Sequence, residues 1–322
     1  MKPRHLMPED VLPTGPSDGG HLRSVVFPFI IFTAIWGSTW IVIRGQIGIV
    51  PPQWSVAYRF VIAAVAMGFV ALWKGESLRI SSKGLLAATF LGFTQFCVNF
   101  NAVYLAERHI TSGVVATVFA LLMIPSSLLG WLFLGQKPSA RFAWFSLLAV
   151  AGICLLFIHE LHRNGATSRE VATGIGITFL GMLGASTANV VQARPEIRRF
   201  PLFTMLTWSM AAGATIDGII AAVMTGPPVI DTSSTYVAGL FYLALAASVL
   251  TFSLYYPVIR KIGPAKTAYS SAVVPIIAMG FSTWFENYRW TPLAFAGAFL
   301  ALAGMAGALS GRGPPQTAPD AG

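Results

Sequence analysis

The feature that most constrains this chain is a series of long apolar stretches separated by only a few polar residues. A helix needs about 20 predominantly apolar residues to cross a bilayer, and each stretch reaches that length. The sequence therefore predicts an all-α integral membrane protein. The ten predicted transmembrane helices are residues 24–44, 53–73, 83–105, 111–135, 139–159, 172–193, 201–225, 235–259, 265–285 and 290–310.

Composition argues against a soluble protein. Hydrophobic residues make up 55% of the chain and charged residues only 10%, whereas soluble domains carry about 25% charged residues. The net charge of +9 does not point to a nucleic-acid partner, because the basic residues lie between the apolar stretches instead of forming a basic patch. We therefore expect the lipid bilayer as a partner, and no nucleic acid.

The Lys and Arg residues are divided unequally between the two sets of alternate loops. With a cytoplasmic N-terminus, 15 of the 21 fall on the cytoplasmic side, five fall outside and Arg59 lies within a span. Because cytoplasmic loops carry an excess of Lys and Arg, this asymmetry predicts ten spans with both termini in the cytoplasm. Two cytoplasmic tails, residues 1–23 and 311–322, flank the spans.

A weak internal repeat divides the spans into two halves. A displacement of 150 residues sets Gly113 on Gly263, Pro125 on Pro275, and Gln136 on Glu286. The halves are residues 24–160 and 172–310, joined by an external linker at 161–171. Because each half holds five helices, an odd number, the second half must be inverted in the membrane relative to the first. Such inverted repeats predict alternating access, in which the halves rock about a site between them.

Several motifs resemble the EamA type of the drug/metabolite transporter superfamily, over residues 24–310. The segment Ala34–Trp40 reads Ala-Ile-Trp-Gly-Ser-Thr-Trp, similar to the family's Trp-Gly-Ser/Thr signature, and Tyr58–Phe60 matches the family's arginine in the second helix. The fourth span has Pro125 and then Leu132–Lys137, with glutamine where the family has glutamate. The second half keeps that acid as Glu286 but lacks the Leu-Gly before it.

The resemblance implies a multi-pass transporter in the cytoplasmic (inner) membrane of a prokaryote, with a central cavity between the halves. It implies a small-molecule substrate, an amino acid-like metabolite or an amphipathic compound, with export as the expected direction and no cofactor. The alternative within the superfamily is a nucleotide-sugar or sugar-phosphate carrier. Such a carrier needs cations in its cavity to bind phosphate, and Arg59 is the only Lys or Arg that lies well inside a span, away from its ends.

A membrane enzyme or a non-transporting scaffold is the alternative from a different class. The sequence His-Glu-Leu-His at 159–162 places its histidines three residues apart, whereas the zinc motif His-Glu-x-x-His needs them four apart on one helical face. No P-loop or nucleophile elbow is present, so direct use of ATP is not expected. We therefore expect neither enzymatic activity nor a bound metal.

Uncharged polar and aromatic residues within the spans are the candidates for a substrate cavity. A polar group in the membrane needs a hydrogen-bond partner, which a water-filled cavity or a neighbouring helix can supply. Contact between helices is therefore the alternative for each of them, and aromatic packing is the alternative for the two tryptophans. The predicted cavity residues are Trp36, Trp40, Gln95, Asn99, Asn101, Asn189, Tyr255 and Tyr256.

Three charged residues are candidates for gating or coupling: Arg59, Asp217 and Glu286. A charge in hydrocarbon is costly, so Arg59 and Asp217 must face protein, water or the membrane interface. Snorkelling to the interface is the structural alternative for both, and a role in helix packing is a further alternative for Asp217. Glycine-rich surfaces in the sixth and tenth spans predict close helix packing, with a homodimer contact as the alternative.

Overall fold

The computed structural model describes residues 22–135, 137–161, 167–258 and 270–309, and every regular element within these ranges is a helix. The helices are η1 (Leu22–Val26), α2 (Phe27–Arg44), α3 (Pro52–Trp73), α4 (Ser82–Leu91), η2 (Gly92–Val98), α5 (Asn99–Ala106), α6 (Ser112–Phe119), η3 (Ala120–Leu122), α7 (Met123–Leu134), α8 (Ala140–Leu161), α9 (Ser168–Ala193), α10 (Pro195–Arg198), α11 (Leu202–Thr225), α12 (Ser234–Phe241), η4 (Tyr242–Leu250), α14 (Ser270–Phe285) and α15 (Pro292–Leu309). Residues 251–258, directly after η4, are also α-helical.

Eight segments are long and apolar enough to cross a bilayer. They agree with the first eight predicted spans to within four residues at each end, which confirms an all-helical membrane fold for the described residues. The last two predicted spans correspond to shorter apolar helices, Val273–Phe285 and Pro292–Ala308. The eight long segments are Ser24–Arg44, Pro52–Trp73, Ser82–Ala106, Ser112–Phe133, Ala140–His159, Ser168–Ala193, Leu202–Thr225 and Ser234–Val258.

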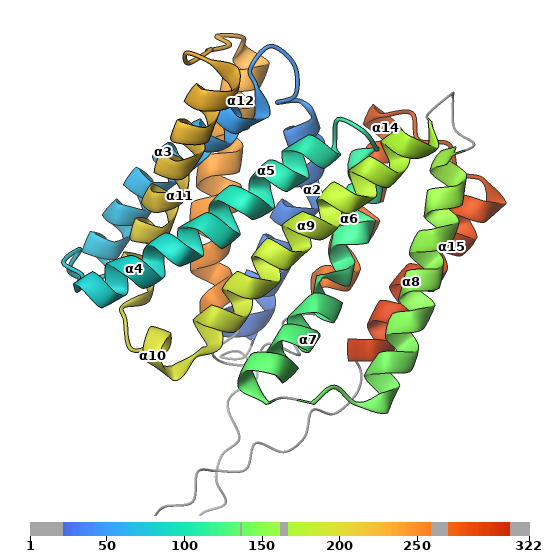
Figure 1. The fold of residues 1–322 in the computed structure, drawn as a ribbon, viewed down its shortest axis with the longest axis horizontal. Helices are drawn as coiled ribbons and strands as arrows, with labels where there is room; N and C mark the ends of the chain where they lie inside the picture. The colour runs from blue at the N-terminus through green and yellow to red at the C-terminus, as the bar shows by residue number, and fades with distance from the viewer. Residues whose placement is uncertain (1–21, 136, 162–166, 259–269, 310–322) are drawn as a thin grey trace, which may run out of the picture.

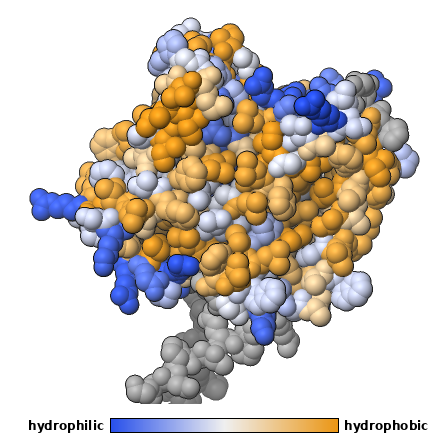
Figure 2. All heavy atoms as spheres, viewed as in Figure 1, coloured by the Kyte–Doolittle hydropathy of each residue, from blue (hydrophilic) through white to orange (hydrophobic). Residues whose placement is uncertain are grey.

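Large apolar side chains cover the outside of the helix bundle. Phe69, Leu132, Val223 and Phe299 are all largely exposed. Figure 2 shows apolar residues over most of one face, with hydrophilic residues gathered toward its edges. Soluble monomers rarely expose so much contiguous apolar surface, so this surface fits the hydrocarbon of a bilayer.

Three spans are interrupted by irregular helical geometry. The third span contains η2 and the eighth contains η4, both π-helical, and the fourth contains the 3₁₀ segment η3 just before Pro125. Pro125 has no N–H to bond the carbonyl four residues earlier, which accounts for the break at η3. Short π-helical segments are frequent at functional sites, and η2 and η4 both lie in the interior of the bundle.

The helices α8 and α15 form the most closely packed pair and lie side by side, apart from α3, α11 and α12 (Figure 1). A Cβ on Gly152 of α8 would overlap the backbone of Ala301 in α15, and a Cβ on Gly304 would overlap Ala149. Small residues thus allow the two backbones to touch. The glycine-rich face of the tenth span is therefore used within the chain, and the homodimer stays a prediction without an assigned surface.

Candidate functional site

Trp36 and Arg59 both bind the π-helical segment η4. The indole Nε1 of Trp36 donates to the carbonyl of Ala247 (3.3 Å), and Nε of Arg59 donates to the hydroxyl of Ser248 (3.2 Å). The hydroxyl of Ser248 itself donates to the backbone carbonyl of Leu243 in the same segment (2.9 Å). The irregular backbone of the eighth span thus binds one side chain from the first span and one from the second, at the consecutive residues Ala247 and Ser248.

The side chain of Arg59 is enclosed by protein, with only 1% of its surface exposed. Its guanidinium carbon lies 4.4 Å from the ring centre of Phe100 and 5.2 Å from that of Phe60, and the guanidinium is next to the phenol of Tyr104. Burial excludes the snorkelling alternative. Among the described residues no carboxylate forms an ion pair with Arg59, and its Nη1 has no hydrogen-bond partner.

An aromatic wall extends from Trp36 toward Arg59. It brings together three predicted cavity residues, because Trp36 packs edge-on against Tyr255 (4.8 Å between ring centres) and Tyr255 packs against Tyr256 (5.6 Å). Phe252 continues the wall. Its ring lies 5.8 Å from Trp36, 5.9 Å from Tyr256 and 5.7 Å from Phe96, which reaches Phe60 at 4.9 Å. We call Trp36, Arg59, Phe96, Ser248 and Phe252 the central layer. Trp40 lies apart from it, against Phe119 (5.5 Å).

Asp217 and Asn101 form a second buried polar site. The Nδ2 of Asn101 donates to Oδ1 of Asp217 (2.7 Å) and to the carbonyl of Cys97 (3.0 Å). Asp217 is fully buried, which excludes snorkelling, and its Oδ2 has no hydrogen-bond partner among the described residues. An unpaired carboxylate is expensive to bury, so this site holds an uncharged carboxyl group at lower cost.

The remaining predicted amides are not gathered into one site. Asn99 is buried in α5 beside Gly181 of α9, so it lies at a contact between helices. Gln95 is buried within η2, and Asn189 is half-buried on α9. No hydrogen bond within the described residues links these three amides to the central layer.

Charged and hydroxyl side chains join the ends of α2, α5, α6 and α14; this carboxylate cluster consists of Arg44, Glu107, Ser112, Ser282 and Glu286. Glu286 accepts hydrogen bonds from the backbone N–H of Ser112 (3.2 Å) and from the hydroxyls of Ser112 (2.6 Å) and Ser282. Its Oε1 lies 3.6 Å from Nε of Arg44. An anion is favourable at a helix N-terminus, so Glu286 caps α6 and connects it to α2 and α14.

Glu107 is the acidic member of this cluster that the sequence does not single out. It lies two residues beyond the predicted span 83–105 and precedes Arg108, a pattern typical of a solvated loop. In the structure it is 0% exposed. Burial raises the pKa of its carboxyl group well above the ordinary value, the Glu286 carboxylate raises that pKa further, and Arg44 lowers it. Helical spacing could have found it, because Glu107 follows the buried Tyr104 by three residues and shares its face.

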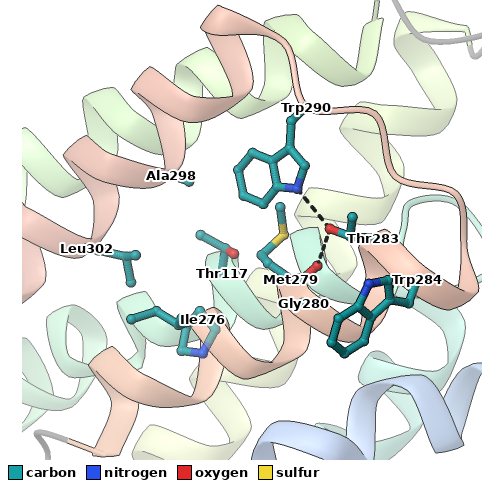
Figure 3. A pocket seen from close by; sticks show the side chains of 10 residues that line it. Thr117, Ile276, Met279, Gly280, Thr283, Trp284, Trp290, Ala298 and Leu302 are labelled. Carbon is teal, nitrogen blue, oxygen red and sulfur yellow. Dashed lines mark hydrogen bonds between the residues drawn. The ribbon is translucent and has the colours of Figure 1, made fainter.

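A cavity of about 300 Å³ lies between α6, α14 and α15, close to Trp290 (Figure 3). In its lining, Nε1 of Trp290 donates to the hydroxyl of Thr283 (2.8 Å), which donates to the carbonyl of Met279 (2.7 Å), and the hydroxyl of Thr117 donates to the carbonyl of Gly113 (2.8 Å). Ile276 of α14 and Leu302 of α15 contribute apolar side chains to the lining. The lining is therefore mainly hydrocarbon, and the side chains of Thr117, Thr283 and Trp290 make their hydrogen bonds within the protein.

A second cavity, of about 430 Å³, lies between α2, α12, η4 and α14. On its wall the hydroxyl of Ser38, within the Trp-Gly-Ser motif, bonds to that of Tyr242 (2.6 Å). Gln46 donates through Nε2 to the carbonyl of Tyr236 (3.0 Å). None of the predicted substrate or coupling residues lines either cavity. No residue of the central layer lines either cavity.

Comparisons with known proteins identify what this arrangement resembles. The model of the EamA-like transporter family matches residues 23–158 and again residues 172–310. The chain is 26% identical over 253 residues to "Uncharacterized inner membrane transporter YedA" of Escherichia coli K12, covering 77% of this chain and 78% of the relative. It is 21% identical over 287 residues to "Probable amino-acid metabolite efflux pump" of the same strain, covering 86% and 91%. A known crystal structure shares the fold with a TM-score of 0.65, at 19% identity, over 88% of this chain and 97% of that chain.

Proposed function

The chain belongs to the EamA-like transporter family, and from its buried site we propose that it exports an amino acid-like metabolite by alternating access. As a member of that family it is a multi-pass transporter of the inner membrane. The proposal adds a substrate class, a direction and a mechanism to this statement. The efflux of amino-acid metabolites printed in the name of one relative supports both the class and the direction.

Arg59 is the observation that carries the substrate class. A buried cation without a counter-ion is costly, so this position is favourable only if an anion reaches it during the cycle. A guanidinium binds a carboxylate through two parallel hydrogen bonds, and Nη1 of Arg59 still has a donor to offer. The aromatic wall beside it fits the apolar part of an amino acid-like compound.

We propose that the transporter has ten spans in two inverted halves with both termini in the cytoplasm. The two family matches and the sequence repeat support this arrangement. The π-helical segments support it independently: η2 begins at Gly92 and η4 at Tyr242, the same displacement of 150 residues as in the repeat. The central layer contains residues of both halves, so a rocking motion between the halves would open it.

Asp217 and Glu286 are proposed to act in coupling and gating, respectively. Asp217 is fully buried with one free oxygen, and Glu286 links the ends of helices from both halves. A phosphate carrier is a poorer fit, because Arg59 is the only Lys or Arg that is buried among the described residues.

The proposal is tested by uptake of amino acids into vesicles that contain the purified protein in the inside-out orientation, because export then carries the substrate into the lumen. Each acid is compared with its methyl ester, which keeps the apolar part and lacks the carboxylate. Wild type should transport the acid and not the ester. Arg59→Leu should lower kcat/KM for the acid roughly 10- to 150-fold, because a hydrogen bond to a charged group is worth about 1.5–3 kcal/mol.

The matched control is Arg79→Gln, which removes a positive charge from an exposed position. It should transport the acid as well as wild type does. Equal transport of acid and ester by wild type, or unchanged transport by Arg59→Leu, would refute the carboxylate assignment.

A further inference from the structure

Glu107 has an environment that does not suit a carboxylate ion. It follows the last residue of α5, and none of its surface is exposed. Neither Oε1 nor Oε2 has a hydrogen-bond partner among the described residues. A buried charge without donors costs several kcal/mol, so the ionised form is the unfavourable one at this position.

The charged groups around Glu107 make its ionisation still less favourable. Glu286, from the end of α14, acts on it as a neighbouring negative charge, and Arg44, from the end of α2, acts as the neighbouring cation. Arg44 is 42% exposed and already lies 3.6 Å from Glu286. On α5 itself the nearest ionisable group is Tyr104, whereas Glu170 at the start of α9 interacts with His109.

Hydrogen-bond donors surround Glu286 and not Glu107. Glu286 receives a backbone N–H and two hydroxyl donors at the N-terminus of α6, in addition to Arg44. When two carboxyl groups are close, one of them takes up a proton. The hydrogen bonds favour Glu107 as that group, since the N–H of Ser112 and the hydroxyls of Ser112 and Ser282 are all directed to Glu286.

We propose that Glu107 is a proton-binding site, filled whenever the ends of α2, α6 and α14 are closed around it. This linkage to conformation rests on the proposed alternating access. Opening these ends admits water to Glu107, which then returns to the behaviour of an exposed glutamate. Closing this side of the transporter therefore binds one proton, and opening it releases the proton to that side.

The direction of the pH effect follows from the raised pKa of the closed state. An exposed glutamate has a pKa of about 4.3, and burial places the pKa of Glu107 above that value. Between the two pKa values the closed state carries a proton that the open state lacks. A rise in pH through this window must therefore shift the population toward the open state, and a fall in pH must favour closure.

Infrared spectroscopy of the full-length protein in lipid nanodiscs tests protonation directly. An Asp217→Asn background removes the other buried carboxyl group. We expect the carbonyl band of a protonated carboxylic acid to persist well above pH ~4.3, where exposed glutamates are ionised. Glu107→Gln should remove this band. If the band stays in Glu107→Gln, or is absent from the parent protein, Glu107 is ionised and the proposal fails.

Two further variants keep this test decisive. Glu76 caps α11 through the N–H (2.8 Å) and hydroxyl (3.1 Å) of Thr204, so Glu76→Gln is the matched control and should leave the band unchanged. Glu286→Gln removes the neighbouring negative charge, and should move the loss of the band to lower pH. This second variant decides the question if Glu107→Gln does not fold. An unchanged titration in Glu286→Gln would contradict the paired carboxyls.

Distances between spin labels test the linkage to conformation. Labels on Ile49→Cys and Arg289→Cys, in a Cys154→Ala background, report on the ends of α2 and α14. Longer distances should gain population between pH ~5 and pH ~8, above the ordinary glutamate pKa. Glu107→Gln should abolish this pH dependence.

The failures of the two proposals are distinguishable. A protonated Glu107 with pH-independent distances would refute the linkage and leave the proton site. Absence of flux with both results intact would refute only the proposed function.

Discussion

The α8–α15 pair and the central layer are built on opposite packing principles. In the pair, glycines bring two regular helices to backbone contact, and a Cβ on Gly152 or Gly304 has no room. In the central layer, large aromatic side chains and a buried arginine meet at a π-helical segment. One buried polar atom of this layer, Nη1 of Arg59, has no hydrogen-bond partner among the described residues.

This difference separates a rigid region from one that can rearrange. Close-packed interiors have few alternative arrangements, because moving one element creates voids or overlaps. The central layer contains an unsatisfied polar atom and irregular backbone. A ligand or another conformation can therefore stabilise this region. We therefore expect substitutions in α8–α15 to act on stability and substitutions in the central layer to act on transport.

The largest effect is expected from a substitution at the α8–α15 contact, which should lower stability and so sharpen this contrast. Gly152→Ala adds a methyl group against the backbone of Ala301, so the helices must separate. Overpacking of this kind should lower the free energy of unfolding by about 1–3 kcal/mol, with KM unchanged in the folded fraction. Thermal unfolding in detergent, beside vesicle flux, measures both. Gly280→Ala, where a Cβ meets nothing within 4 Å, is the control and should unfold as wild type does.

A comparable loss of stability is expected at the Asn101–Asp217 site. Asn101→Leu leaves the buried carboxyl of Asp217 without its donor and should cost about 1–3 kcal/mol. The double variant Asn101→Leu/Asp217→Leu removes both polar groups and should recover most of the stability, while transport stays impaired if Asp217 couples the cycle. Chemical denaturation of the three proteins measures this. A double variant as unstable as the single one would show that Asp217 has a structural role beyond this bond.

The smallest effects are expected from the scattered amides. Gln95→Ala and Asn189→Ala should raise KM for the transported acid by no more than about tenfold, the loss of one ordinary hydrogen bond. Melting temperatures and membrane insertion should stay as in wild type. Concentration-dependent vesicle flux gives the comparison. Normal KM in both variants would remove these two residues from the substrate path and confine the site to the central layer.

Some of the site could be predicted from the sequence and some could not. Trp36, Tyr255 and Tyr256 were predicted as cavity residues and lie together, whereas Trp40 and Asn189 lie elsewhere. Arg59 and Asp217 stand out because charges inside apolar spans are rare. Their partners Ser248 and Asn101 carry no such signal. A hydroxyl or amide in a span is equally compatible with many neighbours.

The sequence by itself determined the membrane spans and the asymmetry of basic loops, because a bilayer leaves a polypeptide few ways to satisfy its backbone other than helices of sufficient length. Only the tertiary structure decided which polar groups meet, which charge is buried and where the backbone becomes π-helical. These outcomes depend on the rotation and tilt of each helix, which are set by packing against its neighbours. Glu107 shows the difference: the sequence places it in a loop, and packing of α2, α5, α6 and α14 buries it beside a second carboxyl group.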